Sequence, residues 1–552
     1  MSYRLKRMAY GCVRRLIDMR DAHTQANTTF PTNRGHNYLV EPLFPDGAGA
    51  GYFTRYYAED VENPLTVDFK RFKTEIVQGR RYPGGTWHEI DCPHPSAIPC
   101  AVTDVDPVNH RAGAEVRFRC PEGNFTFGNL VAERFYYIPV RQPGRIGFRS
   151  NHDLIIGAPL ALVQERPRPR KLVLVLFLDN LGWELVRQVP LEECMPGLAR
   201  FFSKGCVFDN YFVNSNWTLP SVSTLVSGMP LAHHRIFHPT RDLVVGDGYP
   251  TLPEMFRRDG YLTFQACGNW RKSPRYGYAK GYDRTVYRNQ LSMSDILDSY
   301  MSHMQAFPER DSFAWLSIFD LHHPMALVPD VAVQVNTPLA GHDYRVDHAK
   351  SPLQLARSDG RTARYIAEMK RVDTRLAPLL RWIEDTYDDD EMLVAAVADH
   401  GTTFVTDETQ PLALERCHAA FMLRGGGVPV MRSDEFVQST DVMPTLLALS
   451  GIPLETPVEG RVPEVLGGPP ARRHVLSEIM YPDAAYTACL RDATHTFLLE
   501  TTVPVDNEGR IELAGARTRL FRRGSDTDIA ADHPDICAGF LARLKAHVAS
   551  AA

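Results

Sequence analysis

Residues 171–180 read Lys-Leu-Val-Leu-Val-Leu-Phe-Leu-Asp-Asn, an unbroken apolar run that ends in a carboxylate. Residues 392–401, Met-Leu-Val-Ala-Ala-Val-Ala-Asp-His-Gly, repeat this pattern. Strands of a parallel sheet that is buried on both faces have such compositions. Ligand sites in these sheets lie at the carboxyl ends of the strands, so the two runs predict that Asp179, Asp399 and His400 share one edge of a sheet.

Helical stretches alternate with further apolar runs along this part of the chain. Helical patterns at 198–204, 251–259, 293–303 and 362–387 lead into apolar runs at 207–213, 262–266, 313–320 and 392–399. Such alternation predicts an α/β fold with a doubly wound, mostly parallel sheet. The segment 325–360, with His342 and His348, interrupts the pattern, and we expect it to pass over the cleft.

Residues 214–228 predict the start of a helix, because Pro220 suits the first helical turn and an apolar face follows it. Thr218 stands at this start, where unpaired N–H groups and the helix dipole favour an anionic ester. Capping is the ordinary role of a threonine here. Together with the two aspartates and the histidine at the strand ends, however, its hydroxyl completes a divalent-cation site, in which it would be held as an alkoxide nucleophile.

From about residue 171 to the C-terminus, the sequence resembles the sulfatase branch of the alkaline phosphatase superfamily. Besides the motifs above, the resemblance rests on residues 252–284 and on residues 440–451, Thr-Asp-Val-Met-Pro-Thr-Leu-Leu-Ala-Leu-Ser-Gly. The resemblance implies a catalytic domain over 166–552 that includes a small C-terminal subdomain from about residue 470.

The chain departs from this family at the nucleophile. Sulfatases carry Cys-x-Pro-x-Arg, or Ser in place of Cys, and the first residue is oxidised to formylglycine; here Thr218 and Val222 occupy the first and last positions. Threonine cannot form that aldehyde, so sulfate ester hydrolysis is disfavoured. The set of Thr218, Asp179, Asp399 and His400 is more similar to the family's phosphotransferases, such as lipoteichoic acid synthases and phosphoethanolamine transferases, which have Glu in place of Asp179.

Two further family motifs imply anion-binding residues. The family's Gly-Lys-Trp-His segment is here Gly-Asn-Trp-Arg at 268–271, so two sulfate contacts are replaced, although Arg271 or Lys272 could bind an anion. Family members also have a His-rich motif at the end of the strand that here precedes His322 and His323. We expect one of these histidines to act as general acid or anion donor and the other to be structural.

His418, Asn180 and Asn216 complete the candidate residues. His418 follows the Asp399 strand and could face the leaving group, although a histidine satisfied by the scaffold is the alternative. Asn180 could assist the metal or orient Asp179, and Asn216 could line the pocket.

The spacing of residues after Asp320 indicates how many metal ions the site holds. Two-metal members of the superfamily use an Asp-x-x-x-His pair, but Pro324 stands four residues after Asp320. We therefore expect one divalent ion, Mn, Mg, Zn or Ca, held by Asp179, Thr218, Asp399 and His400. One cation suits singly charged phosphodiesters better than phosphate monoester dianions.

The sequence thus predicts a metal-dependent hydrolase or transferase that acts on a phosphoester, a phosphodiester by preference, through a covalent phospho-threonine at Thr218. The substrate would be a small molecule or a glycan-linked phosphoester. Two alternatives are a sulfate ester hydrolase and a non-catalytic glycan-binding protein on the same fold. The intact set of metal-binding residues argues against the second of these.

Composition narrows the class of protein further. The chain has 552 residues, 44% apolar and 23% charged, which suits a soluble protein of two or three domains. A net charge of −5 with scattered arginines argues against a nucleic-acid surface. The sequence has no apolar run that would serve as a signal or membrane span. Ten cysteines without a Cys-x-x-Cys pair are typical of reduced thiols, so we expect a cytoplasmic protein.

The N-terminal region has a different sequence pattern from the rest of the chain. Residues 35–157 contain short alternating runs between Pro and Gly turns, which predict a small antiparallel sandwich. Its role could be glycan binding, packing, homo-oligomerisation or shaping of the cleft. The Pro- and Arg-rich stretch 164–170 predicts a linker, and hence a boundary near residue 165 between an accessory domain over 1–165 and the catalytic domain.

Overall fold

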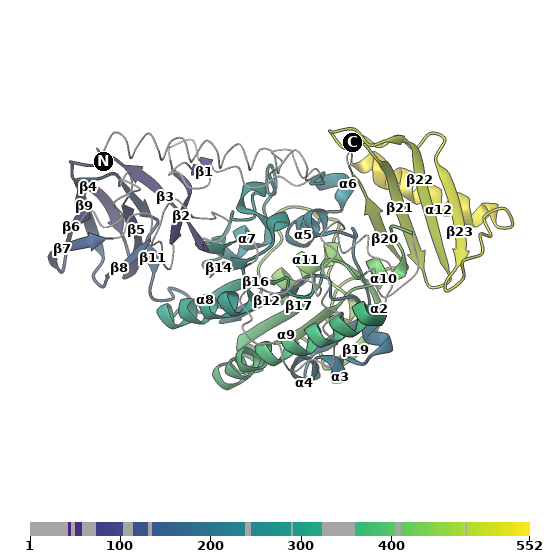
Figure 1. Ribbon diagram of the computed structural model, residues 1–552, viewed down its shortest axis with the longest axis horizontal. Helices are drawn as coiled ribbons and strands as arrows, with labels where there is room; N and C mark the ends of the chain where they lie inside the picture. Colours follow the sequence, from purple (N-terminus) through teal and green to yellow (C-terminus); the bar gives the residue numbers. More distant parts are fainter. Residues whose placement is uncertain are drawn as a thin grey trace.

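The computed structural model arranges the chain in three parts, with an α/β core between an N-terminal group of strands and a C-terminal sheet (Figure 1). It describes residues 42–45, 50–57, 73–102, 114–130, 135–237, 244–288, 291–322, 359–402, 410–481 and 483–551. His323, Pro324, His342 and His348 lie outside these ranges, as does the part of the predicted cleft segment up to residue 358, so what was expected of them stays a prediction.

The core sheet is large and mixed. In the described residues it has 15 strands, with the main order β11-β5-β10-β3-β15-β14-β16-β12-β17-β18-β13-β19. At its centre, β12 (Leu172–Leu178) runs parallel to β16 (Ser312–Ile318) on one side and to β17 (Met392–Val397) on the other. All three strands are buried along their whole length, as expected for strands covered on both faces.

Strands outside this centre run in both directions. On the β16 side, β14 (Leu262–Cys267) and β15 (Arg284–Tyr287) continue the parallel order. On the β17 side, β18 (Phe421–Gly425) is antiparallel to both β17 and β13 (Cys206–Phe212), while β13 is parallel to β19 (Met431–Gln438). The predicted α/β fold with a mostly parallel core is confirmed.

Helices cover both faces of this sheet (Figure 1). One face carries α4 (Pro196–Phe202), α8 (Met293–Ala306) and α9 (Asp359–Thr386), and the other carries α5 (Thr218–Ser227), α7 (Leu252–Arg258) and α11 (Val442–Leu449). Shorter helices lie in the connections: α2 (Trp183–Gln188), α3 (Leu191–Cys194), α6 (Leu231–His234) and α10 (Leu414–Cys417). Within the described ranges, no helix is both long enough and apolar enough to cross a bilayer.

The N-terminal strands extend the core sheet and add a second one. β3 (Lys73–Tyr82) pairs antiparallel with β15, and β10, β5 and β11 follow it in that order toward the edge. A separate antiparallel sheet has the order β4-β9-β6-β7. Side chains such as Ile98, Phe118 and Phe148 pack in a common apolar cluster here. The bounds are β1 (Pro42–Pro45), β2 (Ala50–Tyr57), β4 (His88–Cys92), β5 (Ser96–Val102), β6 (Ala114–Cys120), β7 (Gly123–Leu130), β8 (Tyr136–Val140), β9 (Gly144–Ser150), β10 (Leu154–Gly157) and β11 (Leu160–Ala161).

The predicted antiparallel N-terminal sheet is therefore confirmed. The domain boundary near residue 165 stays a prediction, because strands from both sides of that position belong to one sheet.

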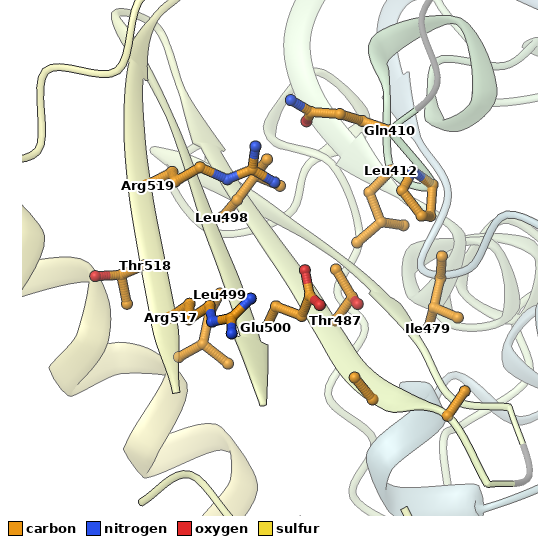
Figure 2. A pocket seen from close by; sticks show the side chains of 13 residues that line it. Gln410, Leu412, Ile479, Thr487, Leu498, Leu499, Glu500, Arg517, Thr518 and Arg519 are labelled. Carbon is orange, nitrogen blue, oxygen red and sulfur yellow. The ribbon is translucent and has the colours of Figure 1, made fainter. Parts of the chain in front are cut away.

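The C-terminal region, where the sequence predicts a small subdomain, contains a four-stranded antiparallel sheet. The sheet consists of β20 (His474–Ile479), β21 (Ala485–Asp492), β22 (His495–Pro504) and β23 (Arg517–Arg522) in that order. Helix α12 (Pro534–Ser550) covers one face of it, where Phe540 stacks on Phe497 with ring centroids 5.4 Å apart. The opposite face lies next to the loop at 410–412 (Figure 2).

Candidate active site

Two aspartates lie at the ends of neighbouring parallel strands. Asp179 directly follows β12, and Asp399 follows β17 after one residue. Because the two strands are paired in parallel, both side chains reach the same edge of the sheet. Both are fully buried. The structure thus brings together two charged groups that are 220 positions apart in the chain, as the strand-end argument predicts.

Each carboxylate uses one oxygen in a hydrogen bond. Asp179 Oδ2 accepts one from Asn269 Nδ2 at 2.7 Å, and Asp399 Oδ1 accepts one from the backbone N–H of Asn180 at 3.1 Å. The other oxygens, Asp179 Oδ1 and Asp399 Oδ2, are buried and make no hydrogen bond to a described residue. Buried anionic oxygens without donors are costly, so this arrangement favours a bound cation.

His400 adds a nitrogen to these two oxygens. Its Nδ1 lies 2.9 Å from the Gly401 carbonyl oxygen, so Nδ1 donates and the neutral ring keeps its lone pair on Nε2. Nε2 lies 3.8 Å from Asp179 Oδ1 and 3.3 Å from Asp399 Oδ2. A carbonyl behind the ring is also how proteins orient metal-binding histidines. The residues therefore fit a divalent metal ion, whose identity they do not specify.

His322 belongs to the same group. Asp179, His322 and His400 are all buried, and each offers one ligand atom within 4.8 Å of the other two. The rings of His322 and His400 lie edge to face, with centroids 6.2 Å apart. Sequence reasoning expected a general acid or anion donor at one of His322 and His323, without choosing between them. The position of His322 also suits a metal ligand.

Thr218 is the first residue of α5, a helix that is buried along its whole length. Trp217 holds the N-cap position, and no side chain caps this helix, so the structure does not show the ordinary capping role for Thr218. Instead, Thr218 Oγ1 lies 3.4 Å from His400 Nε2. The hydroxyl is thereby fixed between the positive end of a ten-residue helix and the candidate metal ligands.

Asn269 and Arg271 form the wall of the site beyond β14. The backbone N–H of Arg271 donates to Asn269 Oδ1 at 2.9 Å, which leaves Asn269 Nδ2 directed to Asp179. Arg271 is buried, and burial lowers the pKa of its guanidinium while the charges of Asp179 and Asp399 oppose this. Burial, and then the charge of Asp399, raise the pKa of Asp179 well above its usual value. Arg271 therefore lies close enough to Asp179 and Asp399 for their charges to act on it.

Lys272, also predicted to bind substrate, lies elsewhere. Its Nζ donates to Ser317 Oγ at 3.0 Å and lies 4.2 Å from the ring centre of Trp315, both on β16. Burial lowers the pKa of its ammonium from 10.5 to about 7. Lys272 thus packs against the sheet, and the prediction that it contacts substrate is not supported by this position.

Lys272→Met is expected to leave KM unchanged and to weaken the pH dependence of stability. In the wild type, the pKa of Lys272 is about 7 in the folded protein and 10.5 when the side chain is exposed. Between these two pH values the unfolded chain therefore binds more protons than the folded one. The free energy of unfolding contributed by this group therefore rises with pH from about 7 to about 10. Urea unfolding at a series of pH values should show a smaller rise in the variant. An equal rise in both proteins would contradict this account.

His418 requires a correction. Its Nδ1 lies 2.6 Å from Glu184 Oε1, its Nε2 lies 2.7 Å from the carbonyl oxygen of Asp209, and its ring stacks on Phe212. Both ring nitrogens are thus engaged by the scaffold, and neither is left to face a leaving group. The alternative stated for this residue, a satisfied structural histidine, describes the observed contacts.

The two asparagines hold the site together. Asn180 adopts a positive φ of 72°, donates from its side chain to the Leu321 carbonyl at 3.2 Å, and accepts at its own carbonyl from Tyr365. Its backbone N–H orients Asp399 rather than Asp179. Asn216 donates to the Pro411 carbonyl at 2.6 Å, which ties the segment before α5 to the next loop.

A groove of about 750 Å³ lies between residues 410–412 and the open face of the C-terminal sheet (Figure 2). Its polar lining includes Arg517 and Arg519 of β23 and Glu500 of β22. Neither arginine forms an ion pair with a carboxylate in the part of the chain that the structure describes. Pro411 lines the groove and accepts the hydrogen bond from Asn216, so the groove adjoins the segment that leads into Thr218.

Sequence reasoning missed Asn269 as a partner of Asp179. Its position in the sequence could have identified it, because Asn269 stands just after the end of β14, as Asp179 stands just after the end of β12. Tyr365, which bonds to the carbonyl of Asn180, carried no such signal, since it lies inside α9 and no strand-end pattern marks it.

Comparison with known proteins places this site in context. The Sulfatase family model matches residues 171–452, just over half of the chain. A search of curated proteins found no match. Among solved structures, the phosphonate monoester hydrolase SpPMH from Silicibacter pomeroyi is similar with a TM-score of 0.54 at 18% identity, over 69% of this chain and 96% of that one.

Two other solved structures are similar to the same extent. The phosphonate monoester hydrolase of Agrobacterium radiobacter has a TM-score of 0.51 at 16% identity, over 69% of this chain and 96% of that one. A 2-O GAG sulfatase has a TM-score of 0.52 at 15% identity, over 70% and 93%. Identities this low show a common fold and leave the substrate to be argued from the site.

Proposed function

The chain belongs to the sulfatase family, and from this premise we propose that it is a metal-dependent hydrolase or transferase of phosphoesters with Thr218 as its nucleophile. Phosphodiesters and other singly charged phosphoryl groups are the preferred substrates. One observation carries the proposal: Thr218 Oγ1 lies 3.4 Å from Nε2 of His400, which is buried. The same nitrogen faces two carboxylate oxygens that accept no hydrogen bond from any described residue.

The proposed ligands of the divalent ion are Asp179, Asp399, His400 and Thr218, with His322 as a further candidate. An ion bound there would lower the pKa of the threonine hydroxyl and reduce the charge on the phosphoryl group. The N-terminus of α5 favours the anionic ester formed at its first residue. Arg271 is the cation proposed to contact the non-bridging oxygens of that group.

In the proposed reaction, the Thr218 oxygen bonds to phosphorus while the bond from phosphorus to the ester oxygen breaks, and the departing oxygen leaves as an alcohol after protonation. Water or an acceptor alcohol then cleaves the phospho-threonine and restores the hydroxyl. Thr218 has no route to formylglycine, so the usual sulfatase nucleophile is missing. This absence favours phosphoesters over sulfate esters.

The groove in Figure 2 is the proposed binding site for the alcohol part of the substrate. It adjoins the segment before Thr218 through the bond between Asn216 and Pro411. Arg517 and Arg519 favour an alcohol that carries its own negative charge, such as an acidic sugar, because guanidinium groups bind carboxylates and phosphates with paired hydrogen bonds.

Arg517→Gln combined with Arg519→Gln should therefore raise KM selectively. For a nitrophenyl phosphodiester of a carboxylated sugar, we expect an increase of about tenfold or more, the scale of a lost charged hydrogen bond. KM for methyl nitrophenyl phosphate should stay unchanged, because methyl is too small to reach the groove. Arg522→Gln, at the exposed end of the same strand, is the matched control. Equal changes for both substrates would exclude this role for the groove.

A substrate panel tests the proposed function as a whole. The panel comprises nitrophenyl phosphate, methyl nitrophenyl phosphate, nitrophenyl phenylphosphonate and nitrophenyl sulfate, each measured with a titration of Mn²⁺, Mg²⁺, Zn²⁺ and Ca²⁺. The diester and the phosphonate monoester, which both carry a single charge, should have the highest kcat/KM. Fastest turnover of the sulfate would contradict the proposal.

A further inference from the structure

A second group of metal-binding side chains lies where α12 packs beside α6. His233 of α6, Glu459 of the connecting loop and His547 of α12 each offer one ligand atom within 4.8 Å of the others. Nδ1 of His233 contacts Glu459 Oε1, and Nδ1 of His547 lies 3.8 Å from Glu459 Oε2. The two rings stack with centroids 5.1 Å apart. Both imidazoles thus direct the same nitrogen to one carboxylate.

An oxygen lies behind the other nitrogen of each ring. His547 Nε2 is 3.2 Å from Oε2 of Glu478, a fully buried carboxylate that also accepts hydrogen bonds from Tyr486 at 2.8 Å and from the Ala232 N–H at 3.0 Å. His233 Nε2 is 3.3 Å from the carbonyl oxygen of His547. Such partners keep the proton on Nε2 and the lone pair on Nδ1, which is how metal-binding histidines are oriented in proteins.

Protons alone explain this arrangement less well. For both rings to pair with Glu459 through Nδ1 and also keep their Nε2 hydrogen bonds, each ring would need a proton on both nitrogens. Both would then be cations, stacked with centroids 5.1 Å apart. Like charges at such a distance repel each other. A single divalent ion takes the place of both protons and uses Glu459 as a shared ligand, while both Nε2 hydrogen bonds are kept.

We propose that His233, Glu459 and His547 bind a divalent transition-metal ion, zinc by preference, which fastens α12 to the catalytic part of the chain. Two imidazoles and one carboxylate with water in the fourth position form a common zinc site. The Glu459 side chain is 42% exposed, so it can adjust to metal–ligand distances of about 2.0–2.2 Å and the ion has access from solvent.

The ion would also support the nucleophile helix. His234 directly follows His233, and its Nε2 lies 3.1 Å from Thr224 Oγ1 of α5. A metal that fixes α6 to α12 therefore stabilises the end of α5 opposite to Thr218. This role is structural and independent of the ion proposed at the active site.

The test uses the full chain without a polyhistidine tag, in a background in which Asp399→Asn and His400→Ala remove the active-site ion. We expect calorimetric titration to show one bound Zn²⁺ per chain and a zinc-dependent rise in Tm. Glu459→Gln should weaken this binding at least about tenfold and abolish the rise. The exposed position of Glu459 makes misfolding of this variant unexpected. Glu455→Gln, which alters an exposed ion pair with Arg258 in the same loop, is the matched control.

A second measurement does not depend on the active-site changes. In otherwise wild-type protein, elemental analysis should find one zinc fewer per chain after Glu459→Gln and no change after Glu455→Gln. Zinc affinity unaltered by Glu459→Gln, or no zinc bound outside the active site, would overturn the proposal and identify the group as an ion-pair cluster held by protons.

Discussion

Thr218→Ala is expected to abolish turnover and to leave the fold intact. The change removes the oxygen that lies 3.4 Å from His400 Nε2, so kcat should fall by about 10⁴-fold or more, the scale of losing a covalent nucleophile. Because Trp217 rather than Thr218 holds the N-cap position, the free energy of unfolding should fall by no more than about 1 kcal/mol. Steady-state kinetics with a nitrophenyl diester and urea unfolding measure the two effects.

Two other variants control for this result. Thr218→Ser keeps a hydroxyl at the helix start and should retain measurable turnover. Ser221, one turn further along α5, donates to the Ser215 carbonyl at 2.8 Å, so Ser221→Ala should alter the helix without removing a reacting group. Wild-type kcat in Thr218→Ala would remove the threonine from the mechanism.

Asp399→Asn is expected to remove the active-site metal and the activity that depends on it. The change takes the charge from a buried oxygen that makes no hydrogen bond to a described residue, while the Asn180 N–H can still bond to the amide oxygen. The loss of activity should be at least about 100-fold, more than the loss of a supporting residue causes. Elemental analysis should show one ion fewer per chain. Full metal content in the variant would refute the ligand assignment.

Although Asp399→Asn should abolish metal binding and activity, it should stabilise the metal-free protein. Without metal, the buried Asp179 and Asp399 repel each other, and the raised pKa of Asp179 reflects burial first and this repulsion second. Asp399→Asn should therefore raise the Tm of the chelated protein at neutral pH. Asp320→Asn is the contrasting control, because Asp320 is paired with Arg371 and its loss should lower Tm.

The centre of the fold could be predicted because it depends on local patterns. The apolar runs at 171–178 and 392–397 are the buried strands β12 and β17, and the helix start near Pro220 is α5. The pairing of distant strands could not be predicted, since residue alternation does not specify which strand lies beside which. β3 joins β15 across about 200 residues, and β18 reverses the direction of the sheet.

In the candidate site, too, the residues marked by a local pattern could be predicted and those placed by tertiary contacts could not. Asp179 and Asp399 are found by their position at strand ends, and the same rule would have found Asn269. His418 and Lys272 were assigned by their neighbours in sequence, although the direction of a side chain depends on tertiary partners. For His418 these partners, Glu184 and Asp209, come from distant segments. Lys272 and Arg271 share one short turn yet lie in different surroundings.

A covalent intermediate at Thr218 is the central claim, and its direct detection is the most decisive measurement. Wild-type protein is mixed with a slowly hydrolysed phosphodiester, stopped in acid within one turnover, digested and analysed by tandem mass spectrometry. The account predicts a phosphoryl adduct on Thr218 that appears before product release is complete and is absent from Thr218→Ala. Turnover with no adduct, or with the adduct on another residue, would contradict it.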